Sequence, residues 1–396
     1  MARRTVASGA SIKMRIGLRD RRPLEQVNSM SHLRAEIAAP DRVGSTPIQC
    51  SRAAHLFPYL ACLREVGAPV DDELRRARLP VLLAEDPDMY LPDVRLRRFL
   101  RAISEKEGID DLAARAVTYS DLTDLSVGTS GAVTESPTLY SALTHFCRRC
   151  TVEDTFLSVW ITGDETAVRV SCLNRVPLDA FARRIEDWVQ LSAVIAIIRS
   201  FAGPEWQPAE IGLHSEWPIS DFAAQLFPNT RLLRGQRSAS VTVPRDLLSL
   251  SGRMNGDGMR SGRAAQAAGD TTERRPDLLS TLRAVLSAYL PDGPIAIDEA
   301  AEMAGISART LQRRLGQAGM SFSQLVQQVR FERAASFLRE SDVTILEVGL
   351  QVGYEDPSHF SRAFRRFAGV SPKQYRQQQC LKSGMSRHTR SGLEAP

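Results

Sequence analysis

The sequence predicts an α+β domain followed by an all-α domain that holds two helix-turn-helix units joined by a helix. Between residues 46 and 248, apolar residues at helical spacing alternate with short β-rich runs, which is typical of an α+β fold. Between residues 276 and 379, short amphipathic helices follow one another. Two of them precede a glycine turn that leads into an arginine-bearing helix, the arrangement of a helix-turn-helix unit.

Three further segments lack periodicity. Residues 1–45 are expected to be a disordered basic extension, residues 249–275 a flexible linker, and residues 380–396 a disordered tail. The extension holds nine basic and four acidic residues, a difference equal to the formal net charge of +5 of the whole chain. The pI of about 9.0 therefore reflects the extension more than the second domain, where positive charge is local.

The first domain is expected to hold helices, then strands around one long helix. Helices are predicted over residues 51–66, 71–77, 92–107 and 137–150, the last opened by Ser136-Pro137 because proline is favoured at the first helical position. Strands are predicted over 155–162 and 167–173, separated by the hairpin signal Gly163-Asp164-Glu165, and over 210–214 and 239–243, with a long helix over 177–201. In the second of these strands, Val168, Val170 and Cys172 are expected to face the core.

The first helix-turn-helix unit is IDEAAEMAGISARTLQRRLGQAG, residues 297–319. Asp298 is expected to cap a helix that runs through Ala304, Gly305 to supply a positive φ in the turn, and Ser307 to cap the second helix. Leu311 and Leu315 are expected to be buried. Arginine can make a bidentate contact with guanine and glutamine with adenine, so the other face of this helix has base-reading chemistry. Its residues are Arg309, Gln312 and Arg313, flanked by Arg314.

The second unit is TILEVGLQVGYEDPSHFSRAFRRFAGVSP, residues 344–372. Thr344 and Glu347 have capping-box spacing, Gly353 repeats the turn glycine, and Asp356-Pro357 supplies a cap and a first helical residue. A buried stripe is expected at Phe360, Phe364 and Phe367, with Gly369 and Pro372 ending the helix. The polar side chains that point elsewhere are Ser358, Arg362 and Arg365.

A helix over residues 322–338 is expected to join the two units, with Leu325, Val329 and Phe337 at helical spacing and Ser321 and Gln324 at its start. At about 1.5 Å per residue, it would hold the two arginine-bearing helices about one DNA turn, near 34 Å, apart. Both helices could then enter successive major-groove segments.

Evidence for chemistry elsewhere in the chain is weak. Cys147 and Cys150 form a CxxC without a second pair, so a shared helix face is favoured over a redox pair or a zinc site. The histidines have no HExxH spacing, and GxSxG and Walker A motifs are absent. We therefore expect no catalytic residue, metal or cofactor. Arg169, Arg183 and Arg184 could bind an acidic effector, although a solvated face is the simpler interpretation.

The sequence also gives no indication of a membrane or secretory segment. No uninterrupted apolar run approaches the roughly 18 residues that span a bilayer, and the arginine-rich start has no apolar h-region. A cytoplasmic location is expected.

The second domain resembles that of AraC/XylS-type transcriptional regulators, most closely over VGYEDPSHFSRAFRRFAGVSPKQYR, residues 352–376. The resemblance implies a seven-helix DNA-binding domain with base contacts at Arg309, Gln312 and Arg313. In the second unit it implies contacts at Pro357, Ser358 and Arg362, although the Pro357 side chain has no donor. The segments LFPYLACLREVGAP, EDPDMYLPDVRLRRFL and SPTLYSAL resemble the N-terminal domain of the subgroup typified by ornithine-utilisation regulators. That domain is taken to sense a small molecule and to assist dimerisation.

These observations predict a sequence-specific regulator that binds double-stranded DNA. Residues 46–248 are expected to bind an unknown small-molecule effector and to dimerise, and residues 276–379 to bind DNA. An effector-responsive activator that forms a homodimer and engages RNA polymerase is favoured. One alternative is a DNA-binding regulator without a small ligand, controlled by its abundance or by a protein partner. Another, less favoured, is an enzyme that acts on a metabolite.

Overall fold

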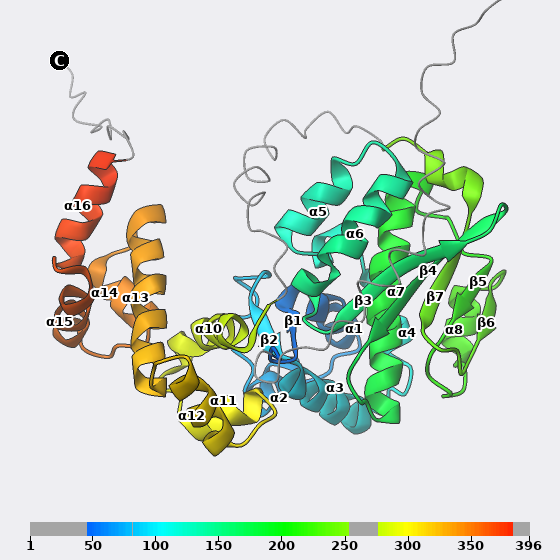
Figure 1. Cartoon of the computed structure of the whole chain (residues 1–396). Coiled ribbons are helices and arrows are strands. Elements are labelled where there is room, and N and C mark those ends of the chain that lie inside the picture. Colours follow the sequence, from blue (N-terminus) through cyan, green and yellow to red (C-terminus); the bar gives the residue numbers. More distant parts are fainter. Residues whose placement is uncertain (1–45, 81, 253–275, 383–396) are drawn as a thin grey trace, which may run out of the picture. The chain divides into compact units, whose positions relative to one another are not determined.

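A five-stranded sheet with the long helix α7 forms the centre of the first part of the chain (Figure 1). The strand order is β3-β4-β7-β5-β6, and all neighbours are antiparallel except β5 and β6, which are parallel. The strands are β3 (Leu157–Gly163), β4 (Ala167–Asn174), β5 (Glu210–Gly212), β6 (Arg231–Leu233) and β7 (Ala239–Pro244). Four of the five were expected in whole or in part, whereas the short β6 was not.

The structure is a computed structural model, and it describes residues 46–80, 82–252 and 276–382. The expected basic extension over residues 1–45 lies outside the described residues. So do residues 253–275 of the expected linker and residues 383–396 of the expected tail.

The β3–β4 hairpin has the predicted turn. The Asp164 carboxylate accepts hydrogen bonds from the main-chain N–H groups of Thr166 and Ala167 at 2.8 and 3.0 Å, which fixes the turn. Along β4 the side chains of Val168, Val170 and Cys172 are buried, as predicted.

Two helices cover this sheet. Helix α6 (Leu139–Glu153) packs against β3, and α7 (Ala180–Ala202) packs against β4 and β7. Helix α7 begins where the Asp179 carboxylate accepts the N–H of Ala182 at 2.8 Å. Helix α6 begins two residues after the predicted Pro137, because the Thr138 hydroxyl caps it by accepting the N–H of Ser141.

The described residues of the first part also hold two further strands and six further α-helices, of which α4 packs against α7. They are β1 (Cys50–Arg52), α1 (Phe57–Glu65), α2 (Val70–Arg76), β2 (Tyr90–Pro92), α3 (Asp93–Glu107), α4 (Leu112–Ala116), α5 (Val127–Thr134) and α8 (Asp221–Leu226). The prediction of one helix over residues 51–66 was wrong at its start. There β1 pairs with β2, and a 3₁₀ turn over Ala53–Leu56 precedes α1.

The second part of the chain, residues 276–382, is all α, as predicted. It holds the seven α-helices that the resemblance implied. They are α10 (Leu278–Tyr289), α11 (Ile297–Met303), α12 (Ala308–Gln317), α13 (Phe322–Glu340), α14 (Ile345–Gln351), α15 (Pro357–Ala368) and α16 (Pro372–Lys382). Helix α13 lies between the two helix-turn-helix units in the chain and packs against α10, α14 and α16. Among the described helices, none combines the length and apolar character that a bilayer crossing requires.

Candidate nucleic-acid interface

Helix α12 presents three polar side chains on the side opposite its buried leucines. Leu311 and Leu315 are its buried residues, as predicted. Arg309, Gln312 and Arg313 are exposed, and Arg314, in the last turn, is half-buried. The Ser307 hydroxyl caps the helix by accepting the N–H of Thr310 at 3.2 Å. The first turn therefore has a fixed orientation.

The turn before α12 depends on Gly305, which has a φ of +64°. Side chains other than glycine rarely adopt this conformation, so the predicted role of this glycine is confirmed. Ala300 and Ala301 of α11 are buried, as small residues at a close helix packing should be. The predicted cap was wrong, however. Helix α11 begins after Ala296, and Asp298 lies in its first turn. There its negative charge interacts favourably with the positive end of the helix dipole.

The second unit is built in the same way but with stronger caps. Thr344 and Glu347 form the predicted capping box on α14. The Asp356 carboxylate accepts the N–H of Ser358 at 2.6 Å and lies before Pro357, the first residue of α15. This hydrogen bond lowers the pKa of Asp356. Proline thus occupies the position where a missing N–H costs nothing.

Aromatic side chains hold α15 against α13. Phe360 and Phe364 are buried and their ring centroids are 5.8 Å apart, while Phe331 of α13 contacts Phe364 at 5.1 Å. Burial of Phe367 was predicted and is wrong, because its side chain is 44% exposed. It instead stacks on Phe331 at the edge of this cluster, with a centroid distance of 5.5 Å.

The second helix-turn-helix unit also exposes its predicted polar residues. Ser358, Arg362 and Arg365 are exposed on α15, and so is Arg366, which lies in the same last turn. Because α15 ends at Gly369 with a φ of +73°, the arginine-bearing turn stops where the sequence predicted.

Apart from Arg333, which pairs with Asp86 of the first part at 3.4 Å, the arginines of the second part fall into two groups. In the first, each side chain has a partner within the domain: Arg283 with Glu332 and Gln328, Arg330 over Tyr354, Arg339 with Tyr375, and Arg376 with the Val343 carbonyl. The second group is Arg309, Arg313 and Arg314 of α12 and Arg362, Arg365 and Arg366 of α15. Within residues 46–80, 82–252 and 276–382, their guanidinium groups make no hydrogen bond or ion pair. These free cations lie on α12 and α15, the two helices that follow the turns.

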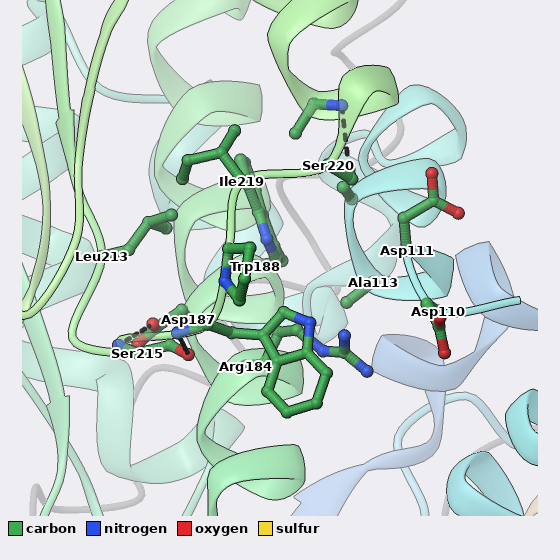
Figure 2. Close-up of a pocket in the computed structure, with 14 residues that line it drawn as sticks. Asp110, Asp111, Ala113, Arg184, Asp187, Trp188, Leu213, Ser215, Ile219 and Ser220 are labelled. Carbon is green, nitrogen blue, oxygen red and sulfur yellow. Dashed lines mark hydrogen bonds between the residues drawn. The ribbon is translucent and has the colours of Figure 1, made fainter.

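Within the first part, a cavity of about 220 Å³ lies beside α7 (Figure 2). Arg184, Asp187 and Trp188 enter it from α7, and Leu213 lies on the side opposite Asp110. The three arginines that were grouped as a solvated face differ in the structure. Arg169 pairs with Glu210 at 2.8 Å and Arg183 with His214, whereas Arg184 lines the cavity. Arg184 shares a helix face with Asp187 and Trp188, which lie three and four residues further along α7.

A second cluster consists of the carboxyl groups of Asp93, Asp154 and Glu186, with ligand oxygens within 4.8 Å of one another. Such oxygens could hold a hard divalent cation. The pKa values of all three carboxyls are also raised. Burial, followed by the charge of Asp93, raises the pKa of Glu186 to about 7. Burial also raises the pKa of Asp93, although Arg97 at 3.6 Å opposes this.

The predicted cysteine pair lies on α6 and shares one helix face, as expected. Both thiols are reduced, and Cys150 donates to the carbonyl of Leu157 at 3.4 Å. Burial raises the pKa of Cys147 to about 12 and that of Cys150 to about 11. Neither thiol is therefore activated as a nucleophile.

Two family models match the chain over these two parts. One describes a helix-turn-helix domain and covers residues 300–378; the other describes the N-terminal arabinose-binding domain of the AraC transcription regulator and covers residues 67–251. This chain belongs to the AraC family of transcription regulators. It binds DNA through its C-terminal domain and has the effector-binding N-terminal domain of AraC-family proteins.

Relatives of this AraC-family chain match either most of its length or about a quarter of it. An HTH-type transcriptional regulator of Mycobacterium tuberculosis is 26% identical over 325 residues, 78% of this chain and 92% of that protein. The ornithine utilization regulator of Pseudomonas aeruginosa is 33% identical over 107 residues, 27% of this chain and 31% of that protein. The crystal structure of the regulator CdpR from Pseudomonas aeruginosa, 22% identical, covers 78% of this chain and 96% of that one, with a TM-score of 0.36.

Proposed function

We propose that α12 reads base edges in one major-groove segment and that α15 binds the next segment mainly through phosphate. The free cations described above carry this proposal. An arginine that has no partner in the protein can direct its donors to guanine or to phosphate oxygens without breaking an internal contact. On α12 these include Arg309 and Arg313, with Gln312 between them as a partner for adenine.

The start of α15 supports a different role for the second helix. The residues of a recognition helix that reach base edges lie near its N-terminus. On α15 that position is held by Pro357, whose side chain cannot donate, and by the short Ser358. Arg362 and Arg365 lie further along, where a cation fits the phosphate backbone. We infer that α15 sets position and affinity, while α12 sets sequence preference.

The effector response requires a contact between the first part of the chain, the proposed sensor, and the DNA-binding second part, the proposed reader. Arg95 of α3 is 1% exposed, and its Nη2 donates to Glu299 of α11 at 2.6 Å. Its guanidinium also lies 4.6 Å from the ring centroid of Tyr289 in α10. Because α11 is the first helix of the first helix-turn-helix unit, this ion pair is a direct route by which the sensor part influences the unit that we propose reads bases.

We further propose that the protein acts in the cytoplasm as a homodimeric, effector-responsive activator that engages RNA polymerase, and that it catalyses no reaction. The activator role is in line with that of one relative, a transcriptional activator of Rhodococcus that is 33% identical over 104 residues. A dimer would double the number of recognition helices and so raise affinity for paired half-sites.

The proposed roles of α12 and α15 are tested by footprinting on the protein's own upstream DNA, followed by operator selection with variants. Arg313→Ala is expected to cost about 1–3 kcal/mol on the selected operator and to relax one base preference. Arg283→Ala, which removes an arginine that pairs with Glu332, is the matched control and should leave the base preference intact. Equal weakening by Arg313→Ala on random and selected DNA would overturn the base-reading role.

A further inference from the structure

The cavity beside α7 has the size and lining of a site for a one-ring molecule. A dry cavity of roughly 150 Å³ is enough for benzene, and this one measures about 220 Å³. Its apolar wall includes Trp188, Leu213 and Ile219. Trp217, which also lines it, is 45% exposed and therefore lies at its rim.

Arg184 is the one cation in the lining, and it lacks a partner. Its Nε is buried, and no described residue accepts a hydrogen bond from its guanidinium. The guanidinium lies 4.5 Å from the centroid of the Trp217 ring and 5.6 Å from that of Phe181, and these contacts use none of its N–H donors. The side chain as a whole is half-buried, and a ligand carboxylate in the cavity would give the buried Nε the acceptor that it lacks.

None of the three acidic residues in the lining accepts a hydrogen bond from Arg184. Asp111 is bound by Arg115, with an Nε–Oδ1 distance of 2.5 Å. Asp187 accepts the N–H of Ser215 at 2.7 Å, and burial raises its pKa to about 7, so this carboxyl holds a proton for part of the time at neutral pH. Asp110 is exposed and makes no ion pair with Arg184. The cavity thus offers a cation and a weakly acidic carboxyl beside an apolar wall.

From this geometry we propose that the cavity is the effector site and that it binds a small aromatic carboxylate. The carboxylate lies in the plane of the Arg184 guanidinium, where planar donors and acceptors match. The ring lies between Trp188 and Trp217, and Trp217 covers it from the rim. This inference rests on the proposed effector response and gives it a chemical class and a location.

Four small probes test the proposed ligand class on the full chain. They are benzoate, the neutral isostere benzamide, the cation benzylamine, and acetate, which has the charge without the ring. Binding is followed by tryptophan fluorescence, since Trp188 and Trp217 line the cavity, and by the shift of the melting temperature. Benzoate is expected to bind at least tenfold more tightly than the other three. Equal binding of benzamide or benzylamine, or no binding of benzoate, overturns the proposal.

Variants then test the residue. Arg184→Gln should weaken benzoate binding at least tenfold, which is the loss expected for one charge-assisted hydrogen bond. Arg184→Lys, which keeps the charge without the planar donors, should retain an intermediate affinity and guards against a folding defect in the glutamine variant. Arg199→Gln is the matched control, because Arg199 is on the same helix but does not line the cavity. Unchanged benzoate binding by Arg184→Gln overturns the assignment.

Failure of this inference is distinguishable from failure of the proposed reader. The probes are titrated without DNA, and the footprint is measured without probes. A specific footprint together with no charge preference among the probes removes the carboxylate site and leaves the reader. Tight benzoate binding together with no specific footprint removes the proposed DNA-reading role and leaves the carboxylate site.

Discussion

The α-carbon of Gly353 faces the main-chain carbonyl of Leu290 so closely that an added Cβ would lie 2.5 Å from that oxygen. The residue also has a φ of +77°. Its counterpart in the first unit, Gly305, has a φ of +64° but open space where a Cβ would lie. The two turn glycines, which looked equivalent in the sequence, therefore meet different constraints. Gly305 satisfies the turn alone, and Gly353 also permits the second unit to pack against the segment after α10.

Gly353→Ala should consequently be the more damaging substitution. Gly305→Ala should lower the free energy of unfolding by about 1–2 kcal/mol, the cost of a left-handed backbone at an alanine. Gly353→Ala adds a main-chain clash, which costs about 1–3 kcal/mol more as overpacking does elsewhere. Denaturant unfolding of both variants measures the difference. Equal losses would show that the Leu290 contact relaxes without cost.

Arg362→Ala should weaken DNA binding without changing sequence preference. If Arg362 neutralises one phosphate, its removal lowers affinity on operator and random DNA alike and reduces the slope of log K against log salt by about 0.9. Titrations at several salt concentrations give this slope, with Arg313→Ala for comparison. A changed base preference at an unchanged slope would instead make Arg362 a base reader.

The ion pair between Arg95 and Glu299 should show a large coupling in a double-mutant cycle. Glu299→Leu leaves the guanidinium of Arg95 buried without its carboxylate, a loss of roughly 3 kcal/mol. Arg95→Met in the same chain should recover much of it. Arg98 and Glu302 join the same two helices at 2.6 Å, but their side chains are 48% and 42% exposed. This control cycle should give about 1 kcal/mol or less.

Glu186→Gln should reduce the sensitivity of stability to pH between about 4 and 7. The folded-state pKa of about 7 lies above the value of about 4.3 expected for an unfolded glutamate. The folded state therefore holds the proton more tightly, and the free energy of unfolding falls as pH rises through this window, by at most about 1.4 kcal/mol per pH unit and proton. Glu153 acts in the opposite sense at lower pH. Although burial favours its protonation, hydrogen bonds from His55 and Ser126 hold its pKa at about 2.

Melting temperatures across this pH range check the prediction, with Glu135→Gln on the exposed surface as a control. Asp187 contributes in the same direction as Glu186, since its pKa is also raised to about 7. The glutamine variant should therefore flatten the decline without abolishing it. A decline as steep as that of the wild-type chain would contradict the role of Glu186.

The DNA-binding part could be predicted from the sequence because its signals are local. Caps such as Ser307 and Asp356 act within three residues, and a turn glycine is required by its own φ. Asp298 was misjudged as a cap because Ala296, which lacks a capping side chain, holds that position. The first part was less predictable, since its contacts join distant segments. Strand β1 exists only because residues 50–52 meet residues 90–92.

The same distinction applies to the two candidate sites. The exposed arginines follow from helical periodicity around Leu311 and Phe360. The cavity does not, because Arg184 and Trp217 come together only when the loop after β5 folds over α7. Periodicity alone could not separate Arg184 from its neighbour Arg183, which faces His214.

Helix α12 is attached to its domain by few side chains, and this makes the protein a candidate for retargeting. Only Leu311 and Leu315 of its ten residues are buried. A different ten-residue sequence that keeps Leu311 and Leu315 could replace α12 after Ser307. The aromatic cluster under α15 would not be changed. Libraries built at the exposed positions of this one helix would then yield regulators that answer to the same inducer at new promoters.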